Sequence, residues 1–393
     1  MPATDSSSAA APLTSFGRSF LSLRRDHANS ADLDIDAFQR HVADLFIDLL
    51  SDSTSPDFLS LAWTRRLLDS FLICLEEFRA ILSSLGATVV AAPLLDRLLS
   101  DFLDRAVKAL DLCNALRDGL DLIRQWRKHL AIAAAALASP DPAAPRGEGQ
   151  IRRARKALTD ITIHMLDDKD AGGVVGQRNR SFGRVGSRDS HAHGHSHHRR
   201  SSSGGSSGSS SGSRSWSAAR QLQAIGGGLP VPRAHDNTAT GGFASAVYTM
   251  GAVLFVVAWA LVAAIPCQDR GLQAHLTVPR NFPWAGPVMT LYERILDESK
   301  KKERKHSCGL LKEIHQIELS SRQLMEITDA AEFPLAEVKD VEVQEAAQEL
   351  VQVCESLKDG LDPLERQVRE MFHRIVRTRT EMLDYLSRLR NTG

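Results

Sequence analysis

The sequence predicts an all-α protein, with long helices in antiparallel bundles that are joined by a disordered linker and one strongly apolar helix. Three observations predict this class. Aromatic residues are scarce, at 6% of the 393 residues, while Leu and Ala are frequent, and their side chains lose little rotamer freedom in a helix. Apolar residues recur at steps of three and four, which places them on one helix face. Residues 243–265 carry no charge.

The first part of the chain divides into an arm and a helical region. Residues 1–32 begin with a Ser/Ala-rich stretch that has no secretory signal pattern, and we expect a flexible N-terminal arm. Residues 33–170 are expected to form the N-terminal bundle part. Its Ser55-Pro56-Asp57 sequence combines a capping hydroxyl with proline at the first helical position, which predicts a helix start there. The helices expected in this part cover residues 33–50, 56–82, 93–137 and 149–166.

The most regular pattern lies in residues 93–137. Its apolar positions alternate steps of three and four over about four heptads, which is typical of a helix packing seam. Gly119 interrupts this helix, and it either permits close approach of a neighbouring segment or marks a bend. The stripe consists of Leu95, Leu98, Phe102, Ala106, Ala109, Cys113, Leu116, Leu120 and Ile123.

Two contrasting segments occupy the middle of the chain. Residues 171–242 are rich in Gly, Ser, Arg and His, a composition that buries too little apolar surface to offset chain entropy, and we expect a disordered linker. Residues 243–265 are long enough, at 1.5 Å per residue, to cross a hydrocarbon core of about 30 Å. Two interpretations stay open for this helix: a single transmembrane span, or a central helix buried between the helical parts.

Helical patterns resume after a Pro-rich connector over residues 266–286. Residues 287–391 are expected to form the C-terminal bundle part, in which Pro363 opens the last helix. The sequence CNALRDGLD at 113–121 returns as CESLKDGLD at 354–362, with six of nine positions identical. This repeated sequence suggests that the N-terminal and C-terminal bundle parts use similar helix packing seams.

Charge and motifs exclude several classes of function. Lys+Arg and Asp+Glu number 48 each, so the chain has no basic excess for binding nucleic acid. It contains no phosphate loop, GxSxG elbow, HExxH sequence or dinucleotide fingerprint. Its polar residues fall on solvated helix faces. We therefore expect no enzyme activity, no cofactor and no small-molecule substrate.

The linker contains two weaker signals. Closely spaced imidazoles can bind a transition metal, but a compositionally biased segment without a metal site explains the histidines better. Hydroxyl groups directly after Arg199 and Arg200 fit recognition by basophilic kinases. The weak metal candidates are His191, His193, His195, His197 and His198, and the phosphorylation candidates are Ser201, Ser202 and Ser203.

Five segments together carry a family resemblance: SFGRSFLSLRRD (15–26), LLDSFLICLEEFRAIL (67–82), VKALDLCNALRDGLDLIRQW (107–126), WALVAAIPCQDRGL (259–272) and GLDPLERQVREMFHRIVRTRTEMLDYL (360–386). They resemble the plant-specific Bypass-related proteins and specifically their Roh-like branch. The resemblance covers nearly the whole chain except the Gly/Ser/His linker, which is expanded here.

This resemblance implies a non-enzymatic plant protein linked to Exo-type exocyst subunits, secretion and cell-wall or mucilage deposition. It also implies membrane association through residues 243–265, at the plasma membrane or endoplasmic reticulum. Our leading expectation is an adapter with cytosolic helical surfaces. The alternatives are a regulator of root-to-shoot signalling at the endoplasmic reticulum and a soluble cytosolic scaffold. A closed apolar pocket with convergent polar groups favours the regulator.

Overall fold

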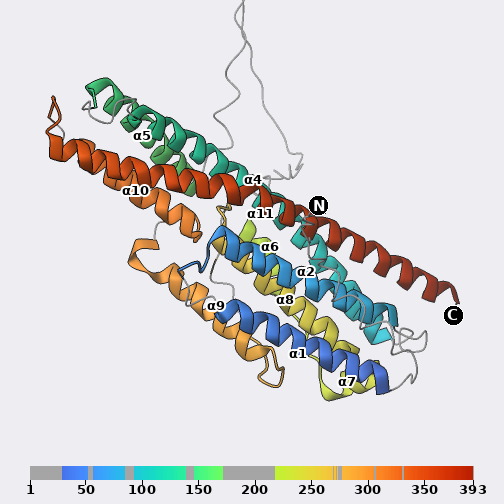
Figure 1. Ribbon diagram of the computed structural model, residues 1–393. Helices are drawn as coiled ribbons and strands as arrows, with labels where there is room; N and C mark the ends of the chain where they lie inside the picture. The colour runs from blue at the N-terminus through green and yellow to red at the C-terminus, as the bar shows by residue number, and fades with distance from the viewer. Residues whose placement is uncertain are drawn as a thin grey trace, which may run out of the picture.

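The computed structural model describes residues 29–51, 56–84, 93–138, 146–170, 217–268, 270, 272, 277–304, 307–329 and 332–392. Within these ranges the chain forms ten α-helices and one short 3₁₀ helix but no strand, which confirms the all-α prediction. Figure 1 shows the helices side by side in an elongated bundle. They are α1 (Asn29–Ser51), α2 (Leu61–Ser84), α4 (Pro93–Leu137), α5 (Glu148–Asp170), α6 (Ala218–Gly226), α7 (Ala234–Thr240), α8 (Phe243–Ala264), α9 (Ala285–Lys300), η3 (Lys302–Arg304), α10 (Lys312–Asp329) and α11 (Glu337–Thr392).

The apolar helix α8 lies at the centre of the bundle. Each of its residues is buried, and α1, α2, α4, α6, α7 and α9 pack around it. α8 is the one helix in the described part of the chain that is long and apolar enough to cross a membrane. Its side chains belong to a hydrophobic core that also takes residues from α2, α4 and α11. Helices from both sides of the central segment therefore share one core.

The two longest helices, α4 and α11, run antiparallel along the bundle (Figure 1). Arg124 of α4 forms ion pairs with Asp362, at 2.9 Å, and Glu365 of α11. Farther along, Arg146, which precedes α5, pairs with Asp340 near the start of α11 at 2.8 Å. The CNALRDGLD and CESLKDGLD segments therefore lie on helices that pack against each other.

The surroundings of Gly119 show whether this glycine permits close approach of a neighbouring segment or marks a bend. A Cβ atom at this position would lie 2.1 Å from the backbone oxygen of Pro266 and 2.8 Å from the Ile265 side chain. α4 continues as one helix past this point. Gly119 thus permits the close approach of the segment that follows α8.

Two helix boundaries differ from those predicted. α2 begins at Leu61 instead of Pro56, because Leu59 adopts a left-handed conformation with φ of 59°, which a helix cannot contain. The backbone N–H of Lys312 bonds to the Leu59 oxygen at 2.9 Å and holds this turn. α11 passes through Pro363 without a break. Proline has no backbone N–H, so one hydrogen bond of the helix is lost at this position. Burial of the neighbouring Leu361 and Leu364 in the core offsets this loss.

The C-terminal portion of the predicted linker is folded into the bundle. Residues 217–242, its C-terminal portion, contain α6 and α7, which pack on α4 and α8. Ala218, Leu222 and Ile225 of α6 are fully buried. These few apolar residues recur at helical spacing, but the surrounding Gly and Ser masked that pattern.

Candidate partner-binding site

The residues singled out by sequence motifs fall in a part of the chain that the structure does not describe. Both the metal candidates and the phosphorylation candidates lie within residues 171–216, outside the described ranges. Their assignment stays a prediction. These residues are His191, His193, His195, His197, His198, Ser201, Ser202 and Ser203.

One small pocket lies inside the bundle core. A pocket among Phe71, Phe102 and Leu254 has a volume of about 10 Å³, which is about the space that a single water molecule needs. Within the described residues no three His, Cys, Asp or Glu side chains are grouped to hold a metal ion. The core pocket is therefore far smaller than the cavities of several hundred Å³ that usually bind small ligands.

A much larger depression lies on the surface, between α10, α11 and the start of α2. We call it the α10–α11 groove, and its volume is about 840 Å³. Because α10 and α11 follow one another through a short connection, they form a helical hairpin whose open side is this groove. Its lining consists of Asp57, Ser60, Ala62, Lys312, Glu313, Gln316, Leu319, Ser320, Arg322, Gln323, Glu326, Glu349, Gln352, Val353 and Ser356.

One end of the groove is closed by contacts between α10 and the start of α2. The Glu313 carboxylate accepts hydrogen bonds from the backbone N–H of Leu61, with its two oxygens at 3.1 and 3.2 Å. Ser60 accepts a further bond from the Trp63 N–H at 3.1 Å. Lys312 pairs with Asp57 at 3.1 Å. Glu313 and Ser60 thus accept hydrogen bonds from free N–H groups at the N-terminus of α2, where the carboxylate also meets the partial positive charge of the helix.

Glu313 has an environment that is unusual for a carboxylate, since only 5% of its surface is exposed. Burial raises the pKa of the Glu313 carboxyl above its ordinary value, and the hydrogen bond from Leu61 offsets part of this rise. Sequence analysis missed this residue. A glutamate in the first turn of a helix looks like an ordinary surface charge, because nothing in the local sequence shows that α2 begins beside it.

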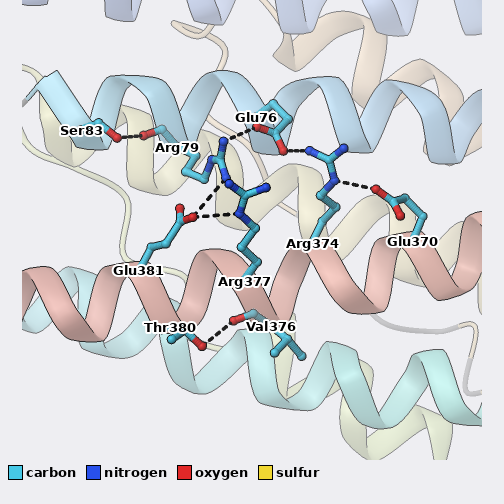
Figure 2. Close-up of polar contacts among 9 residues, drawn as sticks. All are labelled: Glu76, Arg79, Ser83, Glu370, Arg374, Val376, Arg377, Thr380 and Glu381. Atoms are coloured by element: carbon cyan, nitrogen blue, oxygen red, sulfur yellow. Dashed lines mark hydrogen bonds and ion pairs between the residues drawn. The ribbon is translucent and has the colours of Figure 1, made fainter.

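A ladder of ion pairs holds α11 against α2, as Figure 2 shows. Glu76 of α2 pairs with Arg374 of α11, and Arg79 contacts both Glu76, at 2.9 Å, and Glu381, at 3.3 Å. Within α11, Glu370 and Arg377 extend the same network at 2.6 and 2.8 Å.

The ladder continues towards the groove. Gln367 of α11 bonds to Asp69, and it accepts a bond from Arg65 at 3.2 Å. Gln367, Arg374 and Glu381 are seven residues apart, so the same helix face meets α2 each time. These ion pairs and hydrogen bonds therefore fix the register between the parallel helices α2 and α11. Together with the contacts of Glu313, which join α10 to α2, they fix the position of the α10–α11 groove.

The side chains on the open part of the groove have few partners. Leu319 is 45% exposed. Glu326 and Glu349 are exposed, and neither forms an ion pair with another residue of the described ranges. The groove therefore offers an apolar side chain, amides and carboxylates for contact with another molecule.

The sequence of the whole chain is similar to that of known plant proteins. The family model described as "Protein ROH1-like" matches residues 8–386. The chain is 54% identical over 391 residues to Protein ROH1D of Arabidopsis thaliana, with 94% of this chain and 96% of that protein covered. It is 35% identical over 386 residues to Protein ROH1A of the same plant, with 90% of each chain covered. No solved structure matches.

Proposed function

The chain belongs to the ROH1-like family, and from this premise we propose that it is a non-enzymatic adapter of plant secretion that binds an exocyst subunit. The observation that carries the proposal is the α10–α11 groove of about 840 Å³, beside a core whose pocket measures about 10 Å³. An open groove between two helices suits the docking of a helix from a protein partner. The exocyst partner follows from the resemblance to Bypass-related proteins.

A direct binding measurement tests the adapter proposal. Full-length protein is titrated with a purified Exo-type exocyst subunit in an isothermal titration calorimeter. We expect saturable binding in the micromolar range or tighter, about −8 kcal/mol or more favourable. Heat that does not saturate, from protein shown to be folded by circular dichroism, contradicts the proposed partner.

We also propose that α8 stays inside the bundle during this function, and that the protein reaches membranes through its partner. Three kinds of contact support this. All residues of α8 are buried by other helices. The N–H groups of Leu310 and Leu311 cap the Ala263 and Ala264 carbonyls at the C-terminal end of α8, at 2.9 and 3.1 Å. The indole N–H of Trp284 donates to the hydroxyl of Thr249 in α8 at 3.0 Å.

Moving α8 into a bilayer would break these contacts and expose the apolar faces of its neighbours. Phe71 and Phe78 of α2, Leu112 of α4 and Leu291 of α9 are fully buried in the shared core. Each such side chain contributes about 1.5–3 kcal/mol through burial, so exposing all four would cost an amount comparable to the whole stability of a typical domain.

Alkaline carbonate extraction of the expressed protein separates the two interpretations of α8. A core helix leaves the protein in the supernatant, whereas a transmembrane helix keeps it in the membrane pellet. Retention in the pellet after carbonate treatment contradicts the buried-core proposal and supports the transmembrane span.

A further inference from the structure

The open side of the α10–α11 groove has the spacing of a helix seam that lacks one helix. Gln316, Leu319, Gln323 and Glu326 follow one another along α10 at steps of three, four and three residues, and all of them line the groove. On α11, the groove-lining residues Glu349, Gln352 and Ser356 follow at steps of three and four. Residues at such steps form one continuous stripe on a helix.

These two stripes match the dimensions of a short helix. From Gln316 to Glu326 the α10 stripe extends over about 15 Å at 1.5 Å per residue, which corresponds to about three helical turns. At the centre of the α10 stripe lies Leu319, 45% exposed, with glutamine amides on both sides. An apolar side chain from a bound helix would bury Leu319, while polar neighbours would bond to the amides.

The charge of the groove indicates the chemistry of its ligand. Four carboxylates and two cations line it, which gives a net charge of −2. Asp57 and Glu313 are engaged at the α2 end. Glu326 and Glu349 are exposed and have no ion-pair partner within the described residues. This charge disfavours an anionic lipid surface or a nucleic acid, and it favours a cationic segment.

We propose that the α10–α11 groove binds an amphipathic helix of the partner protein. This helix places an apolar side chain on Leu319 and lysine or arginine side chains beside Glu326 and Glu349. The assignment rests on the proposed function, since it locates the surface through which the adapter binds its exocyst subunit. It adds the position of the site, the secondary structure of the ligand and the sign of its charge.

Two full-length variants test the assignment by titration with the same purified exocyst subunit. Leu319→Glu removes the apolar contact, and the double variant Glu326→Lys/Glu349→Lys reverses the charge. Both change exposed side chains, so the fold should persist, which thermal unfolding checks. We expect each variant to bind at least about tenfold more weakly than the unchanged protein, as for side chains at the centre of an interface.

Matched controls change the same residue types elsewhere on the surface. Ile163→Glu alters an apolar side chain of α5 that is 50% exposed. Glu345→Lys reverses an exposed carboxylate on α11 that does not line the groove. Both should bind as tightly as the unchanged protein.

The outcomes separate the two proposals. Binding by the unchanged protein with equal affinity for both groove variants overturns the groove assignment and leaves the adapter function intact. Absence of binding by the unchanged protein overturns the proposed partner, and the groove assignment fails with it. Equal weakening by groove and control variants points to a general charge effect and also overturns the groove assignment.

Discussion

The carboxylate of Glu313, in the first turn of α10, accepts a hydrogen bond from the backbone N–H of Leu61, the first residue of α2, although 252 positions separate them in the sequence. Most helix caps come from the residue just before the helix. Here a glutamate that is distant in the sequence caps the N-terminus of α2, and it also closes one end of the α10–α11 groove. Stability and the shape of the candidate binding site therefore depend on the same contact.

Removal of this cap should destabilise the protein. Glu313→Ala leaves the Leu61 N–H without its acceptor at a buried position, and we expect the free energy of unfolding to fall by about 1–2 kcal/mol. Urea denaturation followed by circular dichroism measures the change. As a control, Glu345→Ala removes an exposed carboxylate of α11 and should change the free energy of unfolding by less than about 0.5 kcal/mol.

The raised pKa of Glu313 predicts a dependence of stability on pH. Because the folded protein holds this proton more tightly than the unfolded chain, the resulting stabilisation is fully present below the unfolded-state pKa. It is lost as the pH rises through the folded-state pKa. Glu313→Gln cannot ionise and has no such loss. The free energy of unfolding of the unchanged protein, relative to Glu313→Gln, should therefore decrease as the pH rises above the ordinary glutamate pKa of about 4.3.

Urea denaturation at several pH values gives this difference directly. A difference that stays constant, or that increases with pH, would show that burial does not raise the Glu313 pKa in the folded protein. The comparison cancels the titration of all other groups, because both proteins share them.

Two glycines should respond in opposite directions to the same substitution. Gly119→Ala would place its Cβ 2.1 Å from the Pro266 backbone oxygen, so the helices must shift, and we expect a loss of about 1–3 kcal/mol in the free energy of unfolding. Gly149 in α5 has no atom within 4 Å of the corresponding position. Gly149→Ala should stabilise the helix by about 0.5–1 kcal/mol. Thermal unfolding that ranks the two variants in reverse order contradicts the close packing of α4 on Pro266.

The hydrogen bond between Trp284 and Thr249 distinguishes a core helix from a membrane span. Thr249→Val leaves the fully buried indole N–H of Trp284 unpaired, and we expect a cost of about 1–3 kcal/mol in the free energy of unfolding. Thr290→Val, which loses only an exposed bond within α9, should cost far less. In a transmembrane helix Thr249→Val would only increase hydropathy, so an unchanged stability of the purified protein argues against the core position of α8.

The ladder between α2 and α11 should contribute a measurable but modest coupling energy. A double-mutant cycle with Glu76→Ala and Arg374→Ala should give about 0.5–1 kcal/mol at low salt and less at high salt, since both side chains are about one-third exposed. The exposed pair Lys358–Glu355, within α11, serves as the comparison and should give less than about 0.5 kcal/mol. Equal coupling energies for both pairs would show that the ladder does not fix the register of α11.

Much of the helix content was predictable from local patterns. The predicted helix over residues 93–137 coincides with α4, and the predicted apolar segment over residues 243–265 differs from α8 by one residue. Proline and charge mark these boundaries, and steps of three and four mark the buried faces. Such signals are encoded within a few turns of the helix that they describe, so they do not depend on the rest of the fold.

Other features depended on contacts between distant segments. The start of α2 at Leu61, the passage of α11 through Pro363 and the burial of α6 all reflect packing against partners far away in the sequence. The α10–α11 groove was not predictable either, because its lining residues come from three helices and look individually like ordinary surface positions.

By itself the sequence determined that this protein is helical, where its strongest helices lie and which family it resembles. Tertiary structure alone decided that α8 is surrounded by helices from both halves of the chain and that Glu313 meets Leu61. The physical reason is that periodicity specifies which face of a helix is apolar but not which partner covers it. That choice follows from the shapes and polar groups of all the helices together.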